Sequence, residues 1–156
     1  MLNILHHYFG TKLLNKIDPE ISHAIALCYL RLLNQFVKKK EIGASILKTQ
    51  IAGMEVPSPI GLAAGFDKNA EVFNATLSLG FGFVEVGTIT PNPQFGNPKP
   101  RLFRLLEEDA LVNKMGFNNK GMLYVSKIAR KPKLGIVGVN LGANAKSIDK
   151  ILDYTN

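Results

Sequence analysis

From residue 50 onward, strand-like and helix-like segments alternate, and this alternation constrains the fold more than any other feature of the chain. Short runs rich in apolar and β-branched residues occupy 59–64, 83–90 and 134–142. Between them, 69–80 and 118–131 carry apolar residues at the three- and four-residue spacing of a helix face. The order strand, helix, strand, helix, strand is typical of a parallel sheet with helical crossovers, so we expect an α/β fold.

Polar caps and a glycine indicate where the helices begin and end. Asn69 and either Asn118 or Asn119 are the expected N-caps, and Gly80 is the expected stop of the first helix. A long insertion, 89–117, begins Pro-rich and continues as two apolar runs about an acidic turn, which predicts a hairpin. Insertions at the C-terminal ends of parallel strands often carry active-site loops.

The first 40 residues have a different pattern, which predicts two short amphipathic helices at 2–15 and 19–37. The second helix opens with Asp18 as its N-cap and Pro19 at its first helical position. Helices of this kind either pack on the rest of the protein or rest on a membrane surface. The pattern alone leaves both arrangements open.

Composition excludes several classes of protein. Cys28 is the single cysteine and the three histidines lack metal-ligand spacing, so we expect a reducing compartment, no disulfide and no metal. No apolar run is long enough to span a membrane, and no secretory signal pattern is present. Most of the +7 net charge lies at 38–40 and 127–133 without interleaved aromatics, so no nucleic-acid partner is expected. The glycines of 80–87 precede a strand, which disfavours a nicotinamide dinucleotide site.

Each expected strand ends in small or polar residues. They are Ala63, Ala64, Gly65, Asp67, Lys68 and Asn69 after the first strand, Gly87 and Thr88 after the second, and Asn140 and Gly142 after the third. Small residues let a flat ligand approach the backbone, and Thr and Asn side chains can bond its polar edge. The pattern suits a heteroaromatic cofactor, although turns and close packing are the more usual reason for small residues at any one strand end.

Two side chains near these strand ends are candidates for ligand contacts. Lys68 stands among small residues, where its charge could neutralise a substrate carboxylate or a reduced cofactor. The alternative is a salt bridge from Lys68 to Asp67 or Glu71. Asn113 offers one acceptor and two donors to a ring that bears both kinds of group.

Four motifs, in this order and at these separations, resemble one known family: "GLAAGFDKN", "GFVEVGTITPNPQFGNPKPRLFRL", "VNKMGFNNKG" and "GVNLGAN". They are similar to the N-terminal part of the quinone-dependent, membrane-associated dihydroorotate dehydrogenases. The opening "DPEISHAIALCYLRLL" is similar to the helical N-terminal extension of that class. The resemblance implies a (β/α)8 barrel with FMN that oxidises dihydroorotate to orotate in UMP synthesis. It also implies a quinone acceptor that enters between the N-terminal helices.

The resemblance also implies roles for individual residues. The residues implied to bind FMN are Ala64, Gly65, Phe66, Asp67, Lys68, Thr88 and Asn140. The residues implied to bind the substrate are Lys68, Asn113, Lys114, Met115, Gly116 and Phe117. The family commonly has Arg where this chain has Lys114, and a lysine keeps the charge but loses the planar fork.

The implied organisation is a membrane- and quinone-associated extension, 1–45, followed by 46–156 as about three of the eight barrel strands. Such a chain would lie peripherally on the cytoplasmic side of the inner (cell) membrane. The family's base, a serine, lies in a later strand loop, so no catalytic base is assigned here. We expect a fragment that is inactive alone and that a separately encoded C-terminal half would complete. The alternatives are a membrane- or partner-binding remnant without chemistry, and a different flavin-dependent barrel oxidoreductase.

Overall fold

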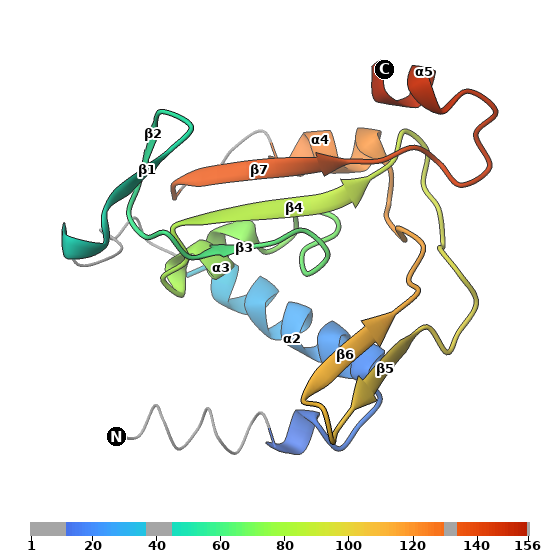
Figure 1. The fold of residues 1–156 in the computed structure, drawn as a ribbon, viewed down its shortest axis with the longest axis horizontal. Helices are drawn as coiled ribbons and strands as arrows, with labels where there is room; N and C mark the ends of the chain where they lie inside the picture. Colours follow the sequence, from blue (N-terminus) through green and yellow to red (C-terminus); the bar gives the residue numbers. More distant parts are fainter. Residues whose placement is uncertain (1–11, 37–44, 130–133, 156) are drawn as a thin grey trace.

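The structure is a computed structural model that describes residues 12–36, 45–129 and 134–155. Figure 1 shows its elements along the chain, which are α2 (Pro19–Asn34), η1 (Ser45–Leu47), β1 (Thr49–Ile51), β2 (Met54–Val56), β3 (Gly61–Leu62), α3 (Phe73–Ser78), β4 (Phe83–Ile89), β5 (Leu102–Leu105), β6 (Ala110–Asn113), α4 (Met122–Ala129), β7 (Ile136–Leu141) and α5 (Lys150–Thr155). The expected order of strands and helices from residue 59 to residue 142 is therefore present.

The central sheet has three parallel strands in the order β3-β4-β7 (Figure 1). Gly61 pairs with Phe83, and Phe83 pairs with Ile136, so the strands start in step. Helices α3 and α4 make the two crossovers, which confirms the parallel α/β prediction. The predicted hairpin in the insertion is also present, as the antiparallel pair β5–β6.

The core lies between this sheet and its two crossover helices. Val84, Val86 and Ile89 of β4 are at most 4% exposed and contact Leu77 of α3 and Val125 of α4 within one cluster. β4 has a strand on each side, and burial of β-branched side chains on one face is typical of such a strand.

The first crossover helix begins later than predicted. Helix α3 starts at Phe73 without a side-chain cap, so the prediction of Asn69 as its N-cap is wrong. The Asp67 carboxylate instead accepts the backbone N–H groups of Glu71 and Val72, each at 2.8 Å, and holds the chain in a loop. Gly80, with a φ of 109°, follows the helix end as expected.

The second crossover helix also begins later, at Met122, so neither Asn118 nor Asn119 is its N-cap. The Asn119 side chain accepts the backbone N–H of Gly121 at 2.8 Å, two residues along, and thereby fixes the approach to the helix. Residues 130 and 131 of the predicted helix lie outside the described residues. The β1–β2 hairpin and α5 were not predicted from the sequence.

The second helix of the extension is α2, as predicted. The Asp18 side chain accepts the backbone N–H of Glu20 at 2.9 Å and of Ile21 at 3.0 Å. Leu30 is buried against α3, whereas the opposite face of α2 is exposed and apolar, through Ile21, Ile25, Tyr29, Leu32 and Phe36. Of the predicted first helix, 12–14 are helical and residues 2–11 lie outside the described residues. No helix within the described ranges is long and apolar enough to cross a membrane.

Ion pairs join both ends of α2 to the α/β part. Near its first turn, Glu20 accepts from Arg101, with Nη2 and Oε1 2.6 Å apart. Near its last turn, Arg31 pairs with Glu71, which also accepts from Lys120 at 2.7 Å. The extension is therefore held on the α/β part at two separate points.

Candidate functional site

A cavity of about 660 Å³ lies where the C-terminal ends of β3 and β4 meet the start of α2 and the β5–β6 hairpin. Figure 1 shows that hairpin beside the first turns of α2. The cavity is lined by Leu14, Asn15, Pro19, Ser22, His23, Ala64, Gly65, Phe66, Lys68, Thr88, Leu102, Arg104, Leu111, Asn113, Met115, Gly116 and Phe117. We call it the strand-end cavity.

Most of the site residues that the sequence predicted come together in the strand-end cavity. They are Ala64, Gly65, Phe66 and Lys68 after β3, Thr88 near the end of β4, Asn113 at the end of β6, and Met115, Gly116 and Phe117 after it. Three predicted residues do not line it, namely Asp67, Lys114 and Asn140. Asp67 is 1% exposed, and its carboxylate is occupied by the backbone bonds that precede α3.

Asn140 lies behind the cavity wall and supports it. The Thr88 hydroxyl donates to Asn140 Oδ1 at 2.7 Å, and Asn140 Nδ2 donates to the Glu85 carboxylate at 3.1 Å. A Cβ at Gly87 would lie 2.5 Å from the Asn140 carbonyl oxygen, so this glycine is required for close packing of β4 on β7. The packing interpretation of small strand-end residues therefore holds at Gly87.

Lys68 is turned toward the backbone of its own loop. Its Nζ donates to the Gly65 carbonyl oxygen at 2.5 Å, and burial lowers the pKa of Lys68. Asp67 is bonded to backbone N–H groups, and Glu71 accepts from other side chains, Lys120 and Tyr124 among them. Among the described residues, the alternative salt bridge from Lys68 to Asp67 or Glu71 is not formed. The Lys68 ammonium is thus held at the cavity by the Gly65 carbonyl oxygen rather than by an acidic side chain.

The segment after β6 supplies the opposite wall. Asn113 Oδ1 accepts the Met115 backbone N–H at 3.3 Å, and Asn113 is one of the residues that line the cavity. Lys114 lies outside the cavity, with its ammonium 5.9 Å from the centroid of the Phe103 ring. Alternation along the chain explains the difference, because successive residues at a strand end point to opposite sides.

His23 and Arg104 are two of the cavity residues that were not predicted. His23 Nε2–H donates to the Phe66 carbonyl oxygen at 2.8 Å, and its ring meets the Phe66 ring edge-on at 5.3 Å. Burial lowers the pKa of His23. Arg104 Nη2 donates to the Leu14 carbonyl oxygen and to the Ser22 hydroxyl, both at 3.1 Å. The available signal was that His23 stands outside the apolar stripe of its helix.

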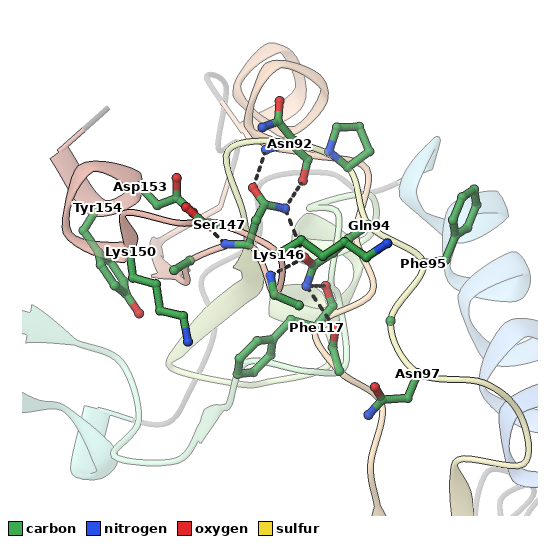
Figure 2. A pocket seen from close by; sticks show the side chains of 16 residues that line it. Asn92, Gln94, Phe95, Asn97, Phe117, Lys146, Ser147, Lys150, Asp153 and Tyr154 are labelled. Carbon is green, nitrogen blue, oxygen red and sulfur yellow. Dashed lines mark hydrogen bonds between the residues drawn. The ribbon is translucent and has the colours of Figure 1, made fainter.

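A second cavity, of about 830 Å³, lies among the loops that follow β4, β6 and β7 and the start of α5 (Figure 2). Gln94 and Asn144 bridge these loops, with Asn144 Nδ2 donating to Gln94 Oε1 at 3.0 Å. Gly116 and Phe117 border both cavities and therefore form the wall between them.

The strand-end cavity combines apolar walls with a few polar groups, which is the arrangement of small-molecule sites. Lys68 and Arg104 supply positive charge, while Thr88 and Asn113 supply donors and acceptors. A Cβ at Gly65 would meet no atom within 4 Å, so the backbone there is open to a flat ligand. The donor set fits a planar ligand that carries an anionic group.

Comparison with known proteins identifies the family to which the chain belongs. A sequence profile described as dihydroorotate dehydrogenase matches residues 46–156. The chain belongs to the dihydroorotate dehydrogenase family. A relative named "Dihydroorotate dehydrogenase (quinone)" from Mesorhizobium japonicum is 50% identical over 147 residues, which are 93% of this chain and 41% of the relative. A relative named "Dihydroorotate dehydrogenase (quinone), mitochondrial" from Cyclocybe aegerita is 45% identical over 152 residues, which are 96% of this chain and 46% of the relative.

Solved structures of the family share the fold. The crystal structure of an Eimeria tenella dihydroorotate dehydrogenase in complex with ferulenol superposes with a TM-score of 0.77 at 38% identity. The match covers 88% of this chain and 39% of the Eimeria chain. The chain therefore spans about two fifths of its relatives' length, and the resemblance and the partial-barrel fold are confirmed. The boundary at residue 45 and the roles of individual residues stay predictions.

Proposed function

We propose that this chain is the front part of a quinone-dependent dihydroorotate dehydrogenase, which oxidises dihydroorotate to orotate. The observation that carries the proposal is the strand-end cavity, where the predicted cofactor loop, the predicted substrate wall and the N-terminal extension meet. The three parts are distant in sequence and would have no reason to share one cavity in an unrelated barrel.

The strand ends would hold FMN. Ala64, Gly65 and Phe66 line the cavity with free space beside Gly65, and Thr88, fixed by Asn140, offers a hydroxyl oxygen. Asp67 would act indirectly, because it shapes the loop that carries these residues. Bound FMN would supply the electron acceptor for oxidation of the substrate.

Lys68 and the segment Asn113–Phe117 would bind dihydroorotate. Burial lowers the pKa of Lys68, yet its ammonium stays close to the Gly65 carbonyl, where it can face an anionic group on a ligand. Asn113, Met115, Gly116 and Phe117 line the cavity and would provide the contacts, whereas the Lys114 side chain lies outside it, beside Phe103.

The extension would bring the chain to the membrane and to its quinone. The exposed apolar face of α2 matches an amphipathic helix that lies in a membrane interface. His23 and Arg104 place polar groups where the extension borders the cavity. The exposed face of α2 supports a peripheral location on a membrane. The family resemblance would put that location on the cytoplasmic face of the inner membrane.

The chain alone would lack a base for the substrate's proton. Ser22 is the only serine that lines the cavity among the described residues, and its hydroxyl donates to the Leu14 carbonyl at 2.7 Å. We therefore expect the base to come from the part of the relatives' length that this chain does not span, about three fifths of it.

Reconstitution tests this proposal. The chain is mixed with FMN and orotate, and binding is followed by flavin fluorescence and calorimetry. Dihydroorotate oxidation with a short-chain quinone is then measured with and without the C-terminal part of the Mesorhizobium relative. We expect FMN binding by the chain and turnover only in the mixture. Lys68→Met should weaken orotate binding about tenfold, and the exposed Lys146→Met should not. Turnover by the chain alone would contradict the assignment of the base to the missing part.

A membrane- or partner-binding role without chemistry is the second candidate, and the exposed face of α2 favours it. Sedimentation with anionic liposomes, with and without residues 1–40, separates the two. Lipid binding that depends on 1–40, together with no detectable FMN binding, would support the second candidate over the first.

A further inference from the structure

The wall between the two cavities contains a residue in an unusual backbone conformation. Phe117 has a φ of 53°, in the left-handed region that bulky residues rarely adopt. Its side chain is not buried, since the residue is 55% exposed, so core packing does not enforce this conformation. Left-handed residues of this kind persist where surrounding groups hold them, and they are frequent at ligand sites.

Two side-chain amides hold the Phe117 peptide. Its carbonyl oxygen accepts from Asn119 Nδ2 at 2.7 Å and from Gln94 Nε2 at 3.3 Å. The same Gln94 nitrogen donates to the Gly116 carbonyl oxygen at 3.0 Å, as the dashed lines of Figure 2 show. Asn119 is itself 7% exposed and bonded to Thr90, so it is a rigid support.

Gln94 also ties this wall to the loop after β7. Its Oε1 accepts from Asn144 Nδ2 and from the Ala145 backbone N–H, both at 3.0 Å. Every hydrogen-bonding group of the Gln94 amide is therefore used, with its donors on the wall and its acceptor on the β7 loop. A bond donated to one side and accepted from the other fixes which way the amide points.

The conformation directs the Phe117 ring toward the strand ends. A Cβ at Gly142, just after β7, would lie 3.9 Å from Phe117 Cδ2 and 2.5 Å from Thr88 Cγ2. The ring and Thr88 thus both lie beside Gly142, close to where the proposed function puts cofactor and substrate. Phe117 could not keep this position with an ordinary negative φ, because the chain direction at the wall would change.

We propose that Gln94 and Asn119 are positioning residues for the substrate wall, which they hold by locking Phe117 in its left-handed conformation. The inference rests on the proposed function, since it assumes that orotate or dihydroorotate binds against this wall. It adds residues that lie outside the predicted site and that act only through the backbone of Gly116 and Phe117.

The test compares two variants of equal charge, with orotate as the probe and FMN present. In Gln94→Glu the carboxylate still accepts from Asn144 and Ala145 but cannot donate to the wall. In Asn92→Asp the same charge enters two residues away, on an exposed side chain. We expect Gln94→Glu to bind orotate about tenfold more weakly and Asn92→Asp within about twofold of the original chain. Equal affinity for Gln94→Glu and the original chain would overturn the inference.

Phe117→Gly separates positioning from general stability, because glycine adopts a positive φ without strain. The variant loses the ring, so orotate should bind about tenfold more weakly. Adding Gln94→Glu to Phe117→Gly should then cost less than about twofold further. Losses that multiply in the double variant would show that Gln94 acts elsewhere and would overturn the inference. If the unmodified chain binds FMN but not orotate, the inference fails; if it binds neither, the proposed function fails first.

Discussion

Two neighbouring strands of one sheet, β4 and β7, differ in how their outward side chains are covered. Val86 pairs with Val139 and Ile89 pairs with Leu141, and paired residues of parallel strands point to the same face. Val86 and Ile89 are 0% and 4% exposed, whereas Val139 and Leu141 are 47% and 57% exposed. The residue types are alike, so burial depends on what covers each strand. β4 has strands on both sides and helices above it, and β7 has a strand on one side only.

The difference separates a part of the molecule whose apolar side chains are covered from a part where they are exposed. Around β4, the cluster with α3 and α4 forms a core of ordinary composition. Along β7, exposed apolar side chains continue into α5, where Ile151 is 78% exposed. Under the proposed function, the rest of the barrel would cover this second region.

The largest effect should come from truncating the covered member of a register pair. Ile89→Ala removes a side chain that is 4% exposed, and we expect a loss of about 3–4 kcal/mol in the free energy of unfolding. Leu141→Ala, its partner across the register, should change that free energy by less than about 0.5 kcal/mol. Urea unfolding followed by circular dichroism measures both. Equal losses would mean that β7 is covered, and the comparison would fail.

A smaller effect should follow from removing the Arg101–Glu20 ion pair, which holds the start of α2. Arg101→Met removes a side chain that is 9% exposed and leaves the Glu20 carboxylate without its closest partner. We expect a loss of about 2 kcal/mol in the free energy of unfolding, below the value for a fully buried pair, because Lys99 stays 3.4 Å from Glu20. Lys48→Met, which removes an exposed ion pair with Glu55, is the control and should cost less than about 0.5 kcal/mol.

A pH effect should report on the contact between extension and cavity. Burial lowers the pKa of His23 below 6.5, so the unfolded chain takes up its proton at a higher pH than the folded one. This contribution to stability is fully present above pH 6.5 and is lost as pH falls toward the folded-state pKa. We expect the Tm to drop by about 2 °C between pH 7.5 and 5.5 because of His23. His23→Gln, which keeps a donor for the Phe66 carbonyl, should lose that part of the drop; an unchanged pH profile would contradict the assignment.

The smallest effect on stability should come from charging the uncovered strand. Val139→Lys alters an exposed position on an edge strand, and we expect a change of less than about 0.5 kcal/mol in the free energy of unfolding. We also expect the open edge of β7 to let copies of the chain associate, and Val139→Lys should reduce that association, because a lysine on an edge opposes strand pairing. Sedimentation velocity over a range of concentrations measures this. Unchanged association would indicate that another surface, such as the exposed face of α2, is responsible.

Local patterns predicted the fold well because they reflect local forces. Alternating strand and helix periodicity identified β4, α4 and β7, and the acidic turn identified the β5–β6 hairpin. Prediction of the N-cap failed at Asn69, since a carboxylate two residues earlier, Asp67, satisfies the backbone of this loop. The β1–β2 hairpin was missed because strands of three residues are too short to show a period.

The candidate site was predictable only where it belongs to strand ends. The small residues around Gly65 and the hydroxyl of Thr88 were visible, because parallel strands bring their C-terminal ends together. His23, Arg104 and Gln94 could not be found in this way. They reach the site through packing of the extension and of the insertion, across separations of tens of residues that no local period records.

The two anchors of α2 set an order of events during synthesis. Arg31 meets Glu71 after 40 further residues, but Glu20 meets Arg101 only after 81. At about 5–20 residues per second, the start of α2 waits about 4–16 s for its partner, although its end can dock in half that time. The start of α2 is thus synthesised before its end but is the later of the two to form its ion pair. Neither ion pair covers the apolar face of α2, which stays exposed in the folded structure. Under the proposed function, that face would therefore be open to a membrane surface both before and after docking.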